Sequence, residues 1–268
     1  MAENKDTRPV KRTLSEDDIT DVTLQQMKEN KEGVTSYPIL DFDARAMGLL
    51  TTGVQETLKS SQVKPAGGLG YRFVKRAFDI VVSALALLIL LIPLGIVMLA
   101  IYIEDKGNPI FSQVRLTENG RPFKMYKLRS MCMDAEERFA EVMKENESDG
   151  LAFKAEHDPR VTKIGDFIRR TSIDELPQFF NVLKGDMSII GPRPPLPREV
   201  VLYTPEHMDR LLVKGGLSCI CQTEGRSDMP FEEWVDTDIE YIKKRSVWLD
   251  LKLMVKTFTA VVKRKGAR

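Results

Sequence analysis

The protein has 268 residues, of which 43% are hydrophobic and 29% are charged, and its formal net charge at pH 7 is +1. This composition is ordinary for a folded protein of one or two domains and by itself names no function. Because the net charge is near zero, the strong positive field that attracts nucleic acid is absent. We therefore expect no nucleic acid partner.

Cysteine and histidine are scarce, which limits redox and metal chemistry. Cys219 and Cys221 are separated by one residue, a spacing that suits neither a disulfide framework nor a zinc knuckle, and the third cysteine is Cys132. The sequence predicts reduced thiols in a cytosolic setting. The two histidines, His157 and His207, lack HExxH spacing and are expected to be surface or packing residues. Acid–base chemistry is therefore expected from carboxylates.

Residues 1–70 are polar and weakly patterned. The stretches 15–29 and 41–60 predict helices, but their apolar residues are too few to form a core of their own. We expect a partly disordered N-terminal extension, with the sequence PAGGLG at 65–70 as a linker. A partner-binding arm is the functional alternative.

An uncharged and almost wholly aliphatic run follows, from Ile80 to Ile103. As a helix its roughly 24 residues would extend about 36 Å, against about 30 Å for the hydrocarbon core of a bilayer. The run therefore predicts a membrane segment. Pro93, near its middle, removes a backbone donor and is expected to kink or break the helix.

Two topologies are compatible with this segment. A simple crossing that follows the positive-inside tendency would leave residues 1–76 in the cytoplasm and everything after Ile103 outside. A helix that enters, bends at Pro93 and returns would keep both ends on the cytoplasmic face. The bend alone does not choose between them.

A β-hairpin is predicted next, because the β-prone runs 109–116 and 122–128 flank an Asn-Gly pair. The second run carries cationic side chains that include Lys127, and Arg129 follows it. These side chains would form either a solvated strand face or a cationic edge that binds substrate phosphate.

Helices are predicted over 134–146, for packing, and over 164–170. The second would deliver Arg169 and Arg170 to the stretch that follows. These two arginines would either complement the C-terminus of their own helix or hold a phosphate.

The stretch 169–194 reads RRTSIDELPQFFNVLKGDMSIIGPRP. Ser172 and Glu175 have the spacing of a capping box, and Gly185 is suited to end the helix that follows. This explanation is purely structural. The functional alternative is a carboxylate dyad, formed by Asp174 and Glu175, at the start of that helix.

The last third of the chain predicts amphipathic helices over 204–212, 231–246 and 248–262, with a β-prone run at 217–222 and a basic tail at 263–265. Basic amphipathic ends are usually solvated faces. Beside a membrane segment, contact with anionic headgroups is an equally good explanation.

Several blocks occur in one order: Lys75-Arg76-x-x-Asp79, YKLRSM, TSIDELPQFFNVLKGDMSIIGPRP, GLSCICQTEGR and SVWLDLKLMVKT. In this order they resemble the bacterial sugar transferases called monotopic phosphoglycosyl transferases. The resemblance covers about residues 71–265, and the block from DELPQ to GPRP is its most specific part. Residues 1–70 lie outside it.

The resemblance implies transfer of a sugar 1-phosphate from a UDP-sugar to polyprenyl (undecaprenyl) phosphate, with release of UMP. This would be the first membrane step in the assembly of a glycan such as an exopolysaccharide, capsule or O-antigen. Asp174 would be the nucleophile, giving a phosphosugar-aspartyl intermediate, and Glu175 its partner near Mg²⁺. Matching positions make Arg169 and Arg193 contacts to substrate phosphate. Both dyad carboxylates are the expected metal ligands.

Lys75, Arg76 and Asp79 match the motif with which this family enters the membrane, where a role in anchoring or in contact with lipid phosphate is implied. Because UDP-sugars are made in the cytosol, the resemblance favours a helix that bends at Pro93 and returns. Ile92 departs from some relatives, which carry a serine there to satisfy freed backbone carbonyls.

The sequence thus predicts an α+β, mostly helical protein at the cytoplasmic face of the bacterial inner membrane. It would comprise an N-terminal extension (1–70), a re-entrant membrane helix (71–106) and a compact cytoplasmic catalytic domain (107–268) with a short β-hairpin and interfacial amphipathic helices. Its partners would be a UDP-sugar, polyprenyl phosphate and membrane lipids. The alternative is a catalytically inactive membrane scaffold for a glycan-assembly complex. The sugar and the presence of a homo-oligomer stay open.

Overall fold

The structure of the protein is a computed structural model. It describes residues 12–13, 40–41, 44–135, 138, 158–221 and 229–262. The predicted helix at 15–29, most of the one at 134–146 and the basic tail at 263–265 lie outside the described residues.

The described residues are mostly helical, as predicted, and their strands are short and paired two by two in three small sheets. The strands are β1 (Arg12–Thr13), β2 (Leu40–Asp41), β3 (Ile110–Leu116), β4 (Pro122–Leu128), β5 (Ser188–Ile190) and β6 (Gly216–Ser218). The helices are α2 (Ala44–Lys59), α3 (Leu69–Asp105), α5 (Lys163–Arg170), α6 (Gln178–Lys184), α7 (Pro197–Val200), α8 (Pro205–Met208), α10 (Phe231–Lys244) and α11 (Val247–Val262), with 3₁₀ turns η1 (Glu118–Gly120), η3 (Ile173–Glu175) and η4 (Asp209–Leu212).

The predicted hairpin is confirmed by the antiparallel pairing of β3 with β4, in which Val114 lies opposite Lys124. Asn119 and Gly120 both have positive φ angles, 59° and 70°. Asn and Gly tolerate this left-handed backbone at little cost, which explains why the chain reverses at this pair.

Helix α6 is joined to β4 by one buried side chain. The amide of Asn181 donates to the carbonyl of Lys124 (2.7 Å), and its oxygen accepts from the backbone N–H of Tyr126 (3.0 Å). Gly185 ends α6 with a φ of 90°, as predicted. The chain then enters β5, which pairs in parallel with β6.

Apolar residues from β4, α6, β5, α10 and α11 meet in the largest buried cluster. Its members are Phe123, Met125, Val182, Met187, Ile189, Ile190, Val213, Tyr241, Ile242 and Leu253. Helix α2 forms no core of its own, in line with its few apolar residues, but its Leu50 and Val54 pack with Leu116 and Tyr203 in a second cluster. This helix, from the N-terminal part of the chain, therefore packs against the hairpin and α8.

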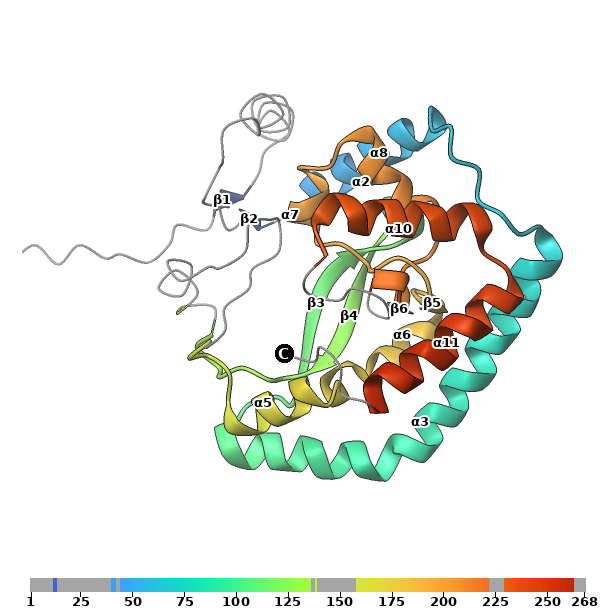
Figure 1. Ribbon diagram of the computed structural model, residues 1–268. Coiled ribbons are helices and arrows are strands. Elements are labelled where there is room, and N and C mark those ends of the chain that lie inside the picture. Colours follow the sequence, from blue (N-terminus) through green and yellow to red (C-terminus); the bar gives the residue numbers. More distant parts are fainter. Residues whose placement is uncertain are drawn as a thin grey trace, which may run out of the picture.

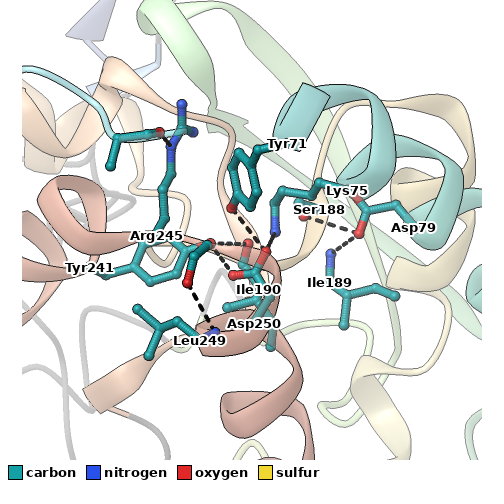
Figure 2. A network of polar contacts seen from close by, with 12 residues as sticks. Tyr71, Lys75, Asp79, Ser188, Ile189, Ile190, Tyr241, Arg245, Leu249 and Asp250 are labelled. Carbon is teal, nitrogen blue, oxygen red and sulfur yellow. Dashed lines mark hydrogen bonds and ion pairs between the residues drawn. The ribbon is translucent and has the colours of Figure 1, made fainter. Parts of the chain in front are cut away.

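The first half of α3 is attached to the domain through polar contacts (Figure 2). Lys75 forms an ion pair with Asp250 of α11 (2.8 Å), whose carboxylate also accepts from the hydroxyls of Tyr71 (2.9 Å) and Tyr241 (2.8 Å). The carboxylate of Asp79 accepts from the backbone N–H of Ile189 (3.0 Å) and from the hydroxyl of Ser188 (3.1 Å).

The second half of α3 is attached to α5 of the same domain. Ile101 packs with Ile168 and Leu128 in a third apolar cluster. The carboxylate of Glu104 accepts from the first free backbone N–H groups of α5, those of Lys163 (3.0 Å) and Ile164 (3.2 Å). Both halves of α3 thus contact the same folded unit.

Helix α3 continues through Pro93, so the chain does not break there. Figure 1 shows it passing beside α11, turning, and then running below α5. Only 6% of the most apolar stretch of this helix is buried. By length and composition, the helix is long and apolar enough to cross a membrane. The described residues therefore contain one candidate membrane helix whose apolar surface the domain leaves uncovered.

One prediction about the cysteines is wrong. The structure pairs Cys219 with Cys221 as a disulfide, whereas Cys132 is free. The chain leaves β6 at Ser218 and turns at once, which brings the two Cα atoms to 5.5 Å, within the range that a disulfide bridges. Spacing in the sequence could not reveal this turn.

Candidate active site

The Asp174-Glu175 pair lies in the 3₁₀ turn η3, between α5 and α6. The predicted capping box is wrong: the side chain of Ser172 makes no capping hydrogen bond and its φ is 57°. Helix α6 begins only at Gln178, because Pro177, with no N–H, precedes it. The two carboxylates therefore occupy a tight turn ahead of the helix rather than its first turn.

Strand β4 supplies the nearest cation. The ammonium of Lys127 lies 2.8 Å from the carboxylate of Glu175, and the two side chains are 23% and 32% exposed. The pair is thus neither sealed in the core nor fully in water, and a ligand can reach it. Among the residues predicted to bind phosphate, Lys127 contacts the dyad directly.

The environment separates the pKa values of the two carboxyl groups. Burial, together with the negative charge of Glu175, raises the pKa of Asp174 to about 6, although Lys127 and Arg169 oppose the shift. Burial also disfavours the charged form of Glu175, but Lys127, Arg193 and Arg115 outweigh it and lower the pKa of this group. At neutral pH both groups are mainly ionised, and Asp174 is the more basic.

Two arginines, Arg169 and Arg193, carry charges that act on the dyad. Among the described residues, neither Arg169 nor Arg193 makes a hydrogen bond or an ion pair through its guanidinium group, and Arg193 is exposed. Guanidinium groups of this kind can bind phosphate oxygens in a bidentate manner.

Sequence reasoning missed Arg115 and Asn181. Arg115 is 5% exposed, donates to the carbonyl of Pro194 (3.0 Å) and so ties β3 to the loop that carries Arg193. Both residues could have been found from the sequence. Arg115 is a charged residue on the inward face of a hairpin, and Asn181 is an asparagine inside a short helix; each is unfavourable there without a partner.

The other predicted residues lie elsewhere. Arg129 is buried and pairs with Asp105 at the C-terminal end of α3 (3.5 Å). Arg76 donates to the carbonyls of Val182 (2.7 Å) and Leu183 (2.8 Å), the last turn of α6. Lys75 and Asp79 make the docking contacts described above, and Pro93 lies within α3. None of these residues makes a hydrogen bond or an ion pair with the dyad among the described residues.

The dyad offers two carboxylates for a cation. The described residues contain no cluster of three or more His, Cys, Asp or Glu side chains that could enclose a metal ion. Mg²⁺ characteristically takes one or two carboxylates and completes its shell with water and substrate phosphate. The donor set formed by Asp174 and Glu175 is therefore compatible with Mg²⁺.

The chain matches the model of the family described as bacterial sugar transferase over residues 70–264. It is 46% identical over 200 residues to a galactosyl transferase of Streptococcus agalactiae, covering 72% of this chain and 43% of the relative. It is 40% identical over 202 residues to the UDP-glucose:undecaprenyl-phosphate glucose-1-phosphate transferase of Escherichia coli, covering 72% of this chain and 41% of the relative.

The chain spans less than half of the length of these two relatives. It is also 32% identical over 213 residues to an exopolysaccharide production protein of Rhizobium meliloti, covering 78% of this chain and 92% of that protein. The family match includes α3, the hairpin, the dyad and α11, and it excludes α2. The chain thus belongs to the bacterial sugar transferase family.

Proposed function

We propose that the protein transfers a sugar 1-phosphate from a UDP-sugar to polyprenyl phosphate and releases UMP. The observation that carries this proposal is the ion pair of Lys127 with the Asp174-Glu175 dyad. The charges of Arg169 and Arg193 also act on the dyad, and among the described residues these two guanidinium groups have no hydrogen-bond or ion-pair partner. A carboxylate repels a phosphate diester until the phosphate charge is neutralised, and such cations supply that neutralisation.

In the first step, a carboxylate oxygen of Asp174 forms a bond to the phosphorus that bears the sugar. The bond between this phosphorus and the bridging oxygen breaks, and UMP leaves with the electron pair. The result is a phosphosugar-aspartyl intermediate. The pKa of about 6 suits this role, since Asp174 is ionised at neutral pH but more basic than an ordinary aspartate.

In the second step, an oxygen of polyprenyl phosphate attacks the same phosphorus. The bond to Asp174 breaks, so that the carboxylate is restored and a sugar-carrying polyprenyl diphosphate is released. Glu175, held by Lys127, would bind Mg²⁺ together with Asp174; when bound, Mg²⁺ neutralises charge on the diphosphate.

We further propose that α3 enters one leaflet and returns to the cytoplasmic face of the bacterial inner membrane. Fully straight, this helix would be about 55 Å long at 1.5 Å per residue. Yet its first half contacts α6, β5 and α11, and its second half contacts α5. One domain cannot hold both ends of a helix that crosses a bilayer. Anchoring then becomes the role of Lys75, Arg76 and Asp79.

Further exposed apolar side chains support a membrane surface on this domain. They lie on α5, α6 and α11 and include Phe167, Phe180, Trp248, Val255 and Phe258. Large apolar side chains at an interface bury favourably among lipid headgroups and acyl chains. These residues support the interfacial role proposed for α11.

The proposed reaction is tested with the purified full chain, polyprenyl phosphate, Mg²⁺ and a panel of UDP-sugars, with UMP as the measured product. We expect release from one donor or a few donors. With ³²P in the sugar-linked phosphate and no acceptor lipid, label should attach to the protein, and mass spectrometry should find it on Asp174. Absence of UMP from every donor, with a folded protein, would favour the inactive scaffold.

The topology is tested by labelling single cysteines with a membrane-impermeant maleimide. Lys64→Cys and Lys163→Cys lie on either side of α3 and are exposed, and Cys132→Ser removes the free native thiol. We expect both sites to be protected in intact cells and labelled after lysis. Labelling of only one of them in intact cells would refute re-entry.

A further inference from the structure

Trp234, on α10, contacts two arginines, of which one is buried and the other is exposed. The guanidinium carbon of Arg210 lies 4.9 Å from the centre of its ring, and that of Arg193 lies 5.7 Å from it. Both distances are within the range of an attraction between a cation and an aromatic face. The indole ring thus links a buried arginine to an exposed arginine whose charge acts on Glu175.

The buried side of this arrangement is fixed. Arg210 pairs with Asp238 at 2.7 Å, both side chains are 2% exposed, and Arg210 also donates to the hydroxyl of Tyr203 (2.9 Å). Asp238 lies one helical turn after Trp234, so the two share a face of α10. Phe231 contacts the indole edge to face, with ring centres 6.3 Å apart. These contacts leave the indole little freedom.

On the side of Arg193, hydrogen bonds hold only the backbone of the loop that carries it. The carbonyl of Pro192 accepts from the N–H of Gly216 (2.8 Å), and the carbonyl of Pro194 accepts from Arg115 (3.0 Å). Between them, the guanidinium group of Arg193 has no hydrogen bond or ion pair to any described residue. In the described part of the chain, the ring of Trp234 is the one aromatic partner of this group.

We propose that Trp234 is a positioning residue that holds Arg193 ready for the substrate phosphate. An arginine side chain loses rotamer freedom when it binds, and a contact that restricts it beforehand lowers that cost. The pair Arg210–Asp238 then serves the reaction from a distance, because it fixes the indole. This inference rests on the proposed function, in which Arg193 binds phosphate.

The test compares Trp234→Leu with Trp234→Phe in the full chain. We expect Trp234→Leu to lower kcat/KM about tenfold, the size of a moderately desolvated cation–π contact, and Trp234→Phe to retain activity within about threefold, because a phenyl face also attracts a cation. Val235→Ala, the matched control, removes a neighbouring core side chain that is 4% exposed. It should lower thermal stability without the tenfold loss.

A double-mutant cycle decides between positioning and mere packing. In an Arg193→Ala background, Trp234→Leu should change kcat/KM by less than about twofold, because the group it positions is gone. UDP binding, measured by calorimetry, should show the same coupling whether or not turnover occurs. A wild-type protein without UMP release would refute only the proposed function. Full activity of Trp234→Leu, or an unchanged effect without Arg193 in both assays, would overturn the positioning role.

Discussion

Two groups of charged side chains in this protein look alike in sequence and differ in their partners. Lys75, Arg76 and Asp79 of α3 are fully engaged with α6, β5 and α11. Arg169 and Arg193 at the dyad have no such partner among the described residues. The first group holds the candidate membrane helix against the domain, whereas the guanidinium donors of the second group make no hydrogen bond within the described residues.

This difference matters because a charged side chain with hydrogen-bond partners and one without them respond differently to substitution. Removal of a buried partner leaves other polar groups without hydrogen bonds and lowers stability. Removal of an unpartnered arginine leaves the fold intact and removes stabilisation of bound phosphate. Activity and stability, measured together, therefore distinguish the two groups.

The largest effect is expected from Asp174→Asn. The amide cannot act as the nucleophile, so UMP release should fall at least about 10³-fold, as is common when a nucleophile is removed. Stability should hardly change, because the carboxylate has no recorded side-chain partner among the described residues. Turnover by single-time-point UMP assays and unfolding by circular dichroism would measure both. Substantial activity would contradict covalent catalysis.

Next in size are Arg169→Met and Arg193→Ala. Each should lower kcat/KM about 10²-fold, the cost of one lost charge donor at a reacting phosphate. Arg170→Met is the matched control, since this neighbour pairs with Asp166 on the surface. Steady-state kinetics over donor concentration give the values. Wild-type rates in both variants would show that the assignment of the site is wrong.

Asp79→Ala tests the opposite group. It leaves the hydroxyl of Ser188 and the N–H of Ile189 without their acceptor, so the free energy of unfolding should fall by about 2 kcal/mol. The variant that remains folded should keep its KM for the donor. Denaturant titration in detergent measures the loss, and Asp166→Ala, at an exposed pair, serves as control. If the free energy of unfolding did not change, Asp79 would have no role in docking α3 on the domain.

The smallest effect is a shift in pH dependence. Because the pKa of Asp174 is raised to about 6, kcat/KM should fall as the pH drops through about 6 and the nucleophile becomes protonated. Lys127 favours the carboxylate, so Lys127→Met should raise this pKa and move the acid limb upward by roughly half a unit to one unit. Lys124→Met, exposed on the same strand, should leave the limb in place. A downward shift would contradict the charge assignment.

Local chemistry made the hairpin and the helix stops predictable. Asn119-Gly120 reverses the chain and Gly185 ends α6, because these residues tolerate the left-handed backbone there. The capping box was wrong because Pro177 delays the helix and Ser172, which has a left-handed backbone, precedes a 3₁₀ turn instead. The disulfide between Cys219 and Cys221 depends on a turn after β6 that spacing does not encode.

The sequence by itself determined that the chain contains a long apolar helix with a proline in its middle, a cationic hairpin strand and an acidic pair before a glycine-ended helix. These features depend on residues close in sequence, whose propensities act locally. Only the tertiary structure decided which charges are free. Lys75 forms an ion pair with Asp250, and Arg193 contacts the ring of Trp234 and keeps its hydrogen-bond donors unused among the described residues. Both contacts join residues far apart in sequence, so they exist only when the chain is folded.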